Sequence, residues 1–296
     1  MADDEAGAVF EQLRGYLFSI AYRLLGSVSD GEDAVQDAYL RWAVADESEI
    51  RSPRAFLATV VVRLCMDRPR SARARHETYI GPWLPEPLAT SARPDLTETV
   101  VLRESLSLAF LHLLEDLAPV ERAVFVLREV FDYDYTDIAA IVGKTAANCR
   151  QVFHRARRRL DEHQARFRTS PEQRQQVTEE FMQATSSGDV QRLLNVLAED
   201  VVLVGDGGGK VPAASPRPVR SRDAVANGII ANLAKFPPER VWVEEVNGGP
   251  AIVVKQGGRL SAVLELNVRD GVITSMYAVA NPDKLQRIAR QLGLPA

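Results

Sequence analysis

The stretch that decides the fold class is residues 135–160, YTDIAAIVGKTAANCRQVFHRARRRL. Ile138 and Val142 recur at helical spacing, Gly143 permits a turn, and Thr145 can cap a second helix. Ala139 is small where the two helices would cross. Small, turn, cap and basic residues that coincide in this register predict a helix-turn-helix, a motif that places its second helix in the major groove of DNA.

The second helix of this motif has an apolar side and a basic side. The inward residues are expected to be Cys149, Val152, Phe153, Ala156 and Leu160. The outward residues, which we expect to contact base edges and phosphates, are Asn148, Arg150, Gln151, His154 and Arg155. An ordinary helical hairpin with a basic face is the alternative, and the coincidence of turn, cap and basic residues disfavours it.

The first eighty residues also carry helical patterns. Leu17, Ile20, Ala21, Leu24 and Leu25 form one apolar stripe, which ends at Gly26. A second helix, capped by Ser29 or Asp30, is expected to bury Ala34, Val35, Ala38, Tyr39 and Trp42 and to expose Asp33, Gln36, Asp37 and Arg41. A third begins at Ser52 and Pro53 with an arginine-rich outer face.

Charge is distributed unevenly along the chain, although the net charge is only -4. Residues 51–75 hold seven arginines against Asp67, and residues 141–168 hold seven arginines and Lys144 against two acids. The first fifty residues are acidic. This alternation suits a protein that contacts phosphates with some surfaces and a basic protein partner with others. Solvated helix faces would explain either basic run taken alone.

Several classes of protein are disfavoured by the composition. No apolar run is long enough to cross a bilayer, and the acidic N-terminus differs from the basic start of a signal peptide, so we expect a cytoplasmic protein. Cys65 and Cys149 both lie in apolar helical patterns, which makes a disulfide or a metal site improbable. No cofactor is expected.

A proline-rich segment separates the two helical regions. Residues 81–87 are GPWLPEP, and Pro94 follows, so residues 81–103 are predicted to form an extended linker. Trp83 and Leu84 are unusual in a spacer. An exposed apolar pair of this kind more often docks onto another surface than stays solvated, with a chance loop tryptophan as the alternative.

The character of the sequence changes after Ser170 and Pro171. Helical patterns give way to alternating segments at 241–243, 251–254, 260–268 and 272–279, separated by turns such as Asn247-Gly248 and Asp270-Gly271. A last helix opens at Asn281 and Pro282. Residues 169–296 are therefore predicted to form an α+β domain whose antiparallel meander follows its helices.

Three segments carry a family resemblance: residues 29–40 (SDGEDAVQDAYL), residues 67–75 (DRPRSARAR) and residues 114–128. They resemble extracytoplasmic-function sigma factors. The resemblance implies a polymerase-binding and promoter-opening domain at 1–80, a helix-turn-helix domain at 104–168, and core RNA polymerase and promoter DNA as partners. It assigns polymerase contacts to Asp33, Gln36, Asp37 and Arg41, and further DNA contacts to Arg63, Arg70, Arg73 and Arg75.

The sequence departs from this family at two positions. Arg63 stands where asparagine is usual, and Pro69 interrupts the basic helix. The resemblance also implies that residues 44–52 form the loop that captures a flipped promoter base.

Three further segments, residues 83–87 (WLPEP), 206–210 (DGGGK) and 281–285 (NPDKL), resemble the sigma factor group with a fused SnoaL-like domain. That resemblance implies an α+β cone with a pocket at 169–296, which acts in cis and can hold a small ligand, so that no separate anti-sigma factor is obligatory. The implied regulatory contacts are Trp83, Leu84, Asp206, Gly207, Gly208, Gly209, Lys210, Asn281, Pro282, Asp283, Lys284 and Leu285.

Catalysis by the cone is not expected. Residues 169–296 contain no histidine, and most of their carboxylates are predicted beside turns or on outward positions. Residues 206–210 lack the spacing of a nucleotide-binding P-loop, so a mobile hairpin or a contact loop is expected there. The alternative for the whole chain is a SnoaL-like enzyme or ligand sensor fused to an ordinary repressor, which binding to core polymerase would exclude.

Overall fold

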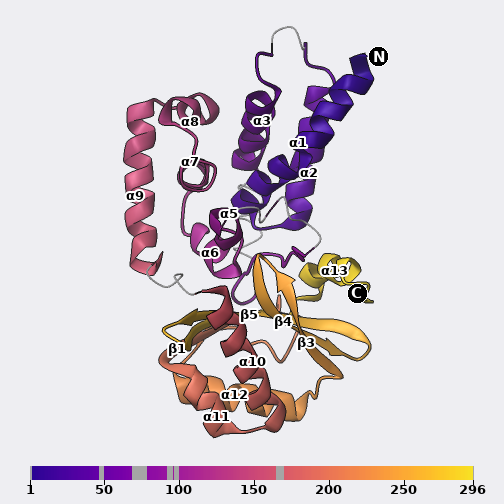
Figure 1. Cartoon of the computed structure of the whole chain (residues 1–296), viewed down its shortest axis with the longest axis vertical. Coiled ribbons are helices and arrows are strands. Elements are labelled where there is room, and N and C mark those ends of the chain that lie inside the picture. The colour runs from indigo at the N-terminus through magenta and orange to yellow at the C-terminus, as the bar shows by residue number, and fades with distance from the viewer. Residues whose placement is uncertain are drawn as a thin grey trace. The chain divides into compact units, whose positions relative to one another are not determined.

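A computed structural model of the chain describes residues 2–46, 50–68, 79–91, 96, 100–164 and 170–295. The chain divides into two compact units (Figure 1). The first contains Met1–Glu77, Pro94–Leu106 and Phe110–His163, and the second contains Thr78–Arg93, Ser107–Ala109 and Gln164–Ala296. Most of the proline-rich segment therefore belongs to the unit that the C-terminal half forms.

The first unit is built from helices. They are α1 (Ala2–Leu25), α2 (Val28–Trp42), α3 (Pro53–Asp67), α5 (Val100–Glu104), α6 (Leu108–Leu114, whose first two residues belong to the second unit), α7 (Pro119–Glu129), α8 (Tyr135–Val142) and α9 (Ala146–Gln164). The predicted apolar stripe of α1 is buried at Leu17, Ile20, Ala21 and Leu24. The expected cap of α3 is confirmed, since the Ser52 hydroxyl accepts from the N–H of Ala55 at 3.3 Å.

The predicted start of α2 is wrong by two or three residues. Ser27, not Ser29 or Asp30, is the N-cap, and its hydroxyl accepts from the N–H of Asp30 at 3.1 Å. Val28 is the first residue of α2, so the chain turns as soon as α1 has ended. Tyr39, predicted to be buried in this helix, is instead 37% exposed.

The helix-turn-helix is confirmed in α8 and α9. Gly143 ends α8 with a φ of 68°, in the left-handed region that glycine adopts readily. Thr145 caps α9 by accepting from the N–H of Asn148 at 3.2 Å. All five residues predicted to face inward from α9 are buried.

The second unit contains one mixed sheet of six strands in the order β2-β1-β6-β5-β4-β3. The strands are β1 (Leu197–Asp206), β2 (Val219–Arg220), β3 (Arg240–Val246), β4 (Gly249–Gln256), β5 (Arg259–Arg269) and β6 (Val272–Val279). Strands β3 to β6 form the predicted antiparallel meander. Asn247-Gly248 and Asp270-Gly271 turn with positive φ at both residues, which matches the twist of the flanking strands. Strand β1 pairs with β6 in parallel.

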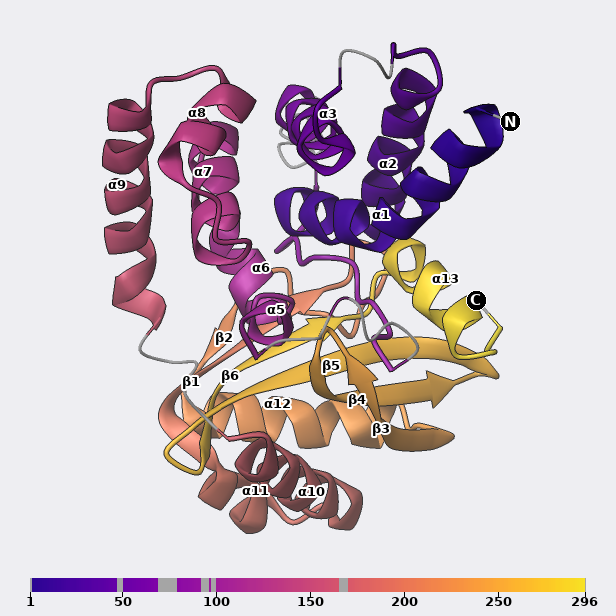
Figure 2. The same ribbon diagram turned by 45° about the horizontal axis from the view of Figure 1, so that its top comes forward.

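Each face of this sheet has its own hydrophobic cluster. One face packs against α10 (Pro171–Ser187), α11 (Val190–Val196) and α12 (Arg222–Lys235). The other packs against α13 (Pro282–Gln291), the start of α6 and the linker residues Leu84 and Ala89 (Figure 2). Linker residues Leu84 and Ala89 are thus part of the core of the second unit.

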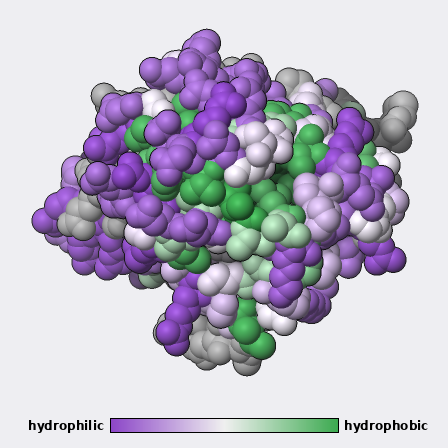
Figure 3. Space-filling model, turned by 90° about the horizontal axis from the view of Figure 1, so that it is seen from below, coloured by the Kyte–Doolittle hydropathy of each residue, from purple (hydrophilic) through white to green (hydrophobic). Residues whose placement is uncertain are grey.

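The side of the second unit that carries α10, α11 and α12 is not uniformly polar. Seen from below the view of Figure 1, apolar surface interrupts the polar surface (Figure 3). Half-buried apolar side chains that pack against the cluster on this side include Leu194, Ile229, Ile230 and Val254. Scattered apolar exposure of this kind is normal for a folded domain.

Candidate functional sites

Lys284, in the first turn of α13, is the centre of a buried polar site. Its ammonium lies 2.7 Å from the Asp206 carboxylate and also donates to the main-chain carbonyl of Leu84. The ring centroid of Trp83 is 3.7 Å from the same nitrogen. Lys284 is 7% exposed and Asp206 is fully buried. A buried ammonium is stable only with partners of this quality, which here come from the linker as well as from the sheet.

Asp206, the last residue of β1, accepts hydrogen bonds from the linker as well as from its own loop. One carboxylate oxygen accepts from the N–H of Leu84 at 2.8 Å, and the other accepts from the Tyr79 hydroxyl and from the N–H of Gly208. Burial and the hydrogen bond to Asp206 raise the pKa of Tyr79, so its hydroxyl stays a donor. The Asn281 side-chain amide donates to the same hydroxyl at 2.7 Å.

We call this group the linker clamp. It consists of Trp83 and Leu84 from the linker, Tyr79 just before the linker, and Asp206, Asn281 and Lys284 from the cone, the name kept here for the α+β part of the second unit at residues 170–295. The parallel pairing of β1 and β6 explains why it forms. Parallel neighbours end at the same edge of a sheet, and here the carbonyl of Asp206 accepts from the N–H groups of Ala280 and Asn281 at 2.8 and 2.9 Å. Two motifs about 75 residues apart therefore meet beside the linker.

The glycines of residues 207–209 allow close approach. A Cβ at Gly208 would lie 2.5 Å from the Asn281 amide nitrogen, and one at Gly209 would lie 2.9 Å from Ile80. One at Gly207 would lie 2.6 Å from the Cβ of Ala214. The loop is therefore a contact loop. Next to it, Lys210 forms an exposed ion pair with Asp283, while Leu285 is buried and Pro282 occupies the first turn of α13.

Further hydrogen bonds hold linker residues Leu88 and Thr90 to the sheet. Leu88 and Asn247 exchange two hydrogen bonds, at 2.8 and 2.9 Å, and the N–H of Thr90 donates to the carbonyl of Glu245 at 3.0 Å. Leu84 is fully buried, and the half-buried Trp83 ring lies against the Lys284 ammonium. The expectation that this pair docks onto another surface is confirmed.

Glu265, in β5, is a second buried carboxyl. It is 8% exposed and accepts from the N–H groups of Leu108 and Ala109 at 2.9 and 3.5 Å. Burial raises the pKa of Glu265 to about 7. Glu265 is thus an exception to the expectation that most carboxylates of residues 169–296 lie beside turns or on outward positions. Sequence reasoning missed Tyr79, Asn247 and Glu265, since tyrosine beside a proline-rich linker, asparagine in a turn and glutamate in an alternating strand are all unremarkable locally.

The residues predicted to bind polymerase lie along α2. Asp33, Gln36 and Arg41 are exposed, as expected. Asp37 is only partly available, because its carboxylate lies 2.6 Å from the Arg68 guanidinium at the end of α3.

The predicted DNA contacts fall into two groups. On α9, Asn148, Arg150, Gln151, His154 and Arg155 are all exposed along one side. On α3, Arg63 donates to the carbonyls of Ile141 and Ala140 in α8, each at 2.9 Å. Arg70, Arg73 and Arg75 lie outside the described residues, as does Pro69, and residues 44–52 are described only in part.

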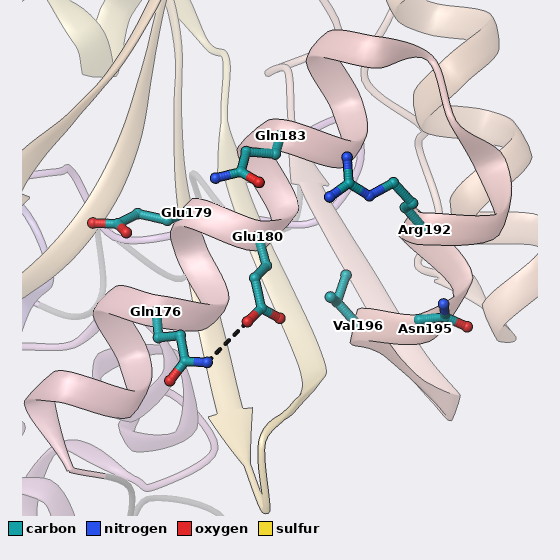
Figure 4. Close-up of a pocket in the computed structure, with 7 residues that line it drawn as sticks. All are labelled: Gln176, Glu179, Glu180, Gln183, Arg192, Asn195 and Val196. Carbon is teal, nitrogen blue, oxygen red and sulfur yellow. Dashed lines mark hydrogen bonds between the residues drawn. The ribbon is translucent and has the colours of Figure 1, made fainter.

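A pocket in the second unit lies between α10 and α11 (Figure 4). Its lining is almost entirely polar and consists of Gln176, Glu179, Glu180, Gln183, Arg192, Asn195 and Val196. Gln176 donates to Glu180 at 2.9 Å. Among the described residues there is no cluster of ligands suited to a metal ion, and no helix is long and apolar enough to cross a membrane.

Comparison with known proteins shows which family contains both helical regions of this chain. The sigma-70 region 2 family matches residues 9–75, and the sigma-70 region 4 family matches residues 107–160. The chain is 37% identical over 287 residues to the ECF RNA polymerase sigma factor SigJ of Mycobacterium tuberculosis, covering 93% of this chain and 91% of the relative. The chain belongs to the ECF RNA polymerase sigma factors. Two probable SigI sequences of the same organism are 34% identical to this sigma factor, over 98% of both lengths.

The crystal structure of SigJ extends the match to the C-terminal unit. It aligns with this ECF sigma factor with a TM-score of 0.77 and 34% identity, covering 94% of this chain and 98% of the other. The predicted architecture, helical region-2 and region-4 domains followed by an α+β domain, is confirmed.

Proposed function

We propose that this sigma factor is regulated in cis by its own C-terminal unit, which holds the chain between the two sigma regions through the linker clamp. As an ECF sigma factor, the chain binds core RNA polymerase and promoter DNA and directs promoter-specific initiation of transcription. The observation that carries the proposal is the buried ion pair of Lys284 and Asp206, which binds both main-chain polar groups of Leu84.

The position of the clamped segment along the chain suggests how the regulation works. Residues 79–91 lie between the parts that match region 2 and region 4. A free linker would let regions 2 and 4 separate over a wide range of distances. When residues 79–91 are docked on the cone, the flexible connection between the two regions is shorter and that range is smaller. Covalent attachment gives the cone a high effective concentration beside the linker, so a modest contact is enough to hold it.

The surfaces for polymerase and DNA follow the predicted residues. We propose that Asp33, Gln36, Asp37 and Arg41 bind core polymerase. We propose that the outward side of α9 reads promoter DNA, together with Arg63, Arg70, Arg73 and Arg75 of the basic segment. We also propose a cytoplasmic location, where polymerase acts.

We assign no catalytic role to the cone. The relatives are sigma factors, and the buried carboxyl of Glu265 is already occupied by two N–H groups of the chain itself. The proposal also requires neither an anti-sigma factor nor a small ligand. The polar pocket of Figure 4 is where a polar ligand would meet the cone if the regulation has an external signal.

The clamp can be tested from the linker side, which leaves the cone intact. Trp83→Ala removes the ring above Lys284, and Tyr79→Phe removes the hydroxyl between Asp206 and Asn281. Both variants should lower promoter-dependent transcription with purified core polymerase, because the interval between the sigma regions is no longer held. Lys235→Met, at an exposed lysine of the cone, is the control and should leave transcription unchanged.

Hydrogen exchange supplies an independent measure of docking. The N–H groups of Leu84 and Leu88 should be protected in the wild type and should exchange faster in Lys284→Met. Equal transcription by all variants, at matched folding and core binding, would leave the cone without a regulatory role even if the exchange data show docking.

A further inference from the structure

In the first unit, arginine side chains link helices α1 and α3 to helices α5, α7 and α8. They do so by donating hydrogen bonds to main-chain carbonyls. Arg63 of α3 donates to two carbonyls of α8. Arg122 of α7 donates to the carbonyl of Leu24 at the end of α1 at 2.7 Å. Arg23 of α1 donates to the carbonyl of Leu102 in α5 at 2.6 Å, and burial lowers its pKa to about 9.

The Arg63 contact is well matched to the end of α8. The last carbonyls of a helix have no partner within the helix. Here the N–H groups of Gly143 and Lys144 both turn back to the carbonyl of Ala139. The carbonyls of Ala140 and Ile141 remain, and the planar guanidinium of Arg63 binds them both while its charge complements the negative end of the helix dipole.

A tyrosine pair supports the same interface. The hydroxyls of Tyr16 in α1 and Tyr133 before α8 lie 2.6 Å apart, and the Arg54 guanidinium lies 4.2 Å from the centroid of the Tyr16 ring. Burial and the partner hydroxyl raise the pKa of Tyr133, so the Tyr133 hydroxyl stays protonated. Polar, directional contacts therefore join α1 and α3 to the α7–α8 region, beside the edge-to-face contact of the Tyr16 ring with the Phe131 ring.

Arg63 cannot bind the carbonyls of Ala140 and Ile141 and a DNA phosphate at the same time. The guanidinium donors that bind Ala140 and Ile141 are the same fork that a phosphate would require. We propose that Arg63 is a latch, which binds the end of α8 in the free protein and is released when region 2 engages promoter DNA in the polymerase complex. This inference rests on the proposed DNA contact of the basic segment, and its test uses the free protein so that the two can fail separately.

The test is energy transfer between two dyes on the full chain. Cysteines replace exposed Ala43, after α2, and exposed Arg158, on α9. The native thiols interfere little, since Cys65 and Cys149 are buried and burial raises the pKa of both, that of Cys65 to about 12. Arg63→Ala and Arg63→Lys are compared with Arg51→Ala, a control at an exposed arginine of the same basic segment.

If Arg63 is a latch, more molecules should show low energy transfer, with the two dyes far apart, when the Arg63 guanidinium is removed. The ratio of open to closed molecules should rise about two- to fivefold in Arg63→Ala, which corresponds to the 0.3–1 kcal/mol of a cation at a helix C-terminus. The rise should be smaller in Arg63→Lys, which keeps the cation but cannot bind both carbonyls with a planar guanidinium. Arg51→Ala should not change the ratio. Arg63→Lys keeps a charge for phosphate, so it should also retain more promoter affinity in the polymerase complex than Arg63→Ala. Unchanged transfer in both Arg63 variants would overturn the latch, whatever happens to DNA binding.

Discussion

At the scale of single residues, the burial of ionisable side chains is what could not be predicted from the sequence. Glu265 stands in an alternating strand where an outward carboxylate is the ordinary expectation, and only the approach of Leu108 and Ala109, over 150 residues earlier, gives it partners. The motif residues Asp206 and Lys284 could be singled out because they resemble family signatures. Their buried pairing could not be derived from spacing, since it depends on which strands become neighbours.

Glu265 makes stability depend on pH. Its pKa of about 7 in the folded chain lies above the ordinary value of 4.5, so the folded state binds the proton more tightly. The resulting stabilisation is complete below pH 4.5 and is lost as pH rises through 7. Glu265→Gln, which stays neutral, should reduce the difference in unfolding free energy between pH 5 and pH 8 by at most about 3 kcal/mol, from 1.36 kcal/mol per pKa unit. Denaturant titrations at the two pH values measure this. An unchanged difference, equal to that of an exposed control such as Glu199→Gln, would refute it.

Arg150 is the residue on which base reading can be tested most directly. Its side chain is exposed on α9 and its guanidinium lies 5.2 Å from the centroid of the Tyr135 ring, which limits its directions. Arg150→Ala should weaken promoter binding in holoenzyme by about 1–3 kcal/mol and relax preference at particular upstream bases. Affinities for a set of single-base promoter variants provide the measurement. A loss that is uniform across the set would mean a phosphate contact.

At the scale of elements, hydrophobic spacing and capping residues correctly predicted those features of helices that depend only on nearby residues. The inward side of α9, the cap of α3 and the glycine turn after α8 all follow from spacing and capping chemistry. Strand β1 was not predicted, because its parallel partner β6 is made about 70 residues later and nothing nearby in the sequence marks the pairing. The cap of α2 was misplaced because one residue suffices to reverse the chain after α1.

Helix α2 presents a surface that a charge reversal can test. Asp33 is exposed, and, unlike Asp37, it is not the acid that pairs with Arg68. Asp33→Lys should therefore abolish co-purification with core polymerase while the far-ultraviolet circular dichroism stays unchanged, since like charges at an interface repel. Glu11→Lys, at an exposed acid of α1, is the matched control. If Asp33→Lys still binds core as well as this control, the proposed surface is wrong.

At the scale of the whole molecule, the C-terminal unit provides the cover for the linker. Leu84 and Leu88 are fully buried; Leu84 packs in the apolar cluster to which β1, β4 and α13 contribute, and Leu88 is hydrogen-bonded to Asn247. A chain that ends at residue 169 should expose both leucines, so limited proteolysis should cut within residues 79–91, which resist cleavage in the full chain. Mass spectrometry of the fragments locates the cut. Protection that survives the truncation would show that the sigma regions cover the linker themselves.

The hydrogen bond between Leu84 and Lys284 joins residues 200 positions apart, and this separation has a consequence during synthesis. A ribosome that adds 5–20 residues per second needs about 10–40 s to make the intervening chain. Both sigma regions therefore emerge and can fold before the cone exists. Each newly made molecule passes through a period in which its promoter-recognition parts are complete and its linker is unrestrained. The rate of translation beyond residue 164 then sets how long that period lasts.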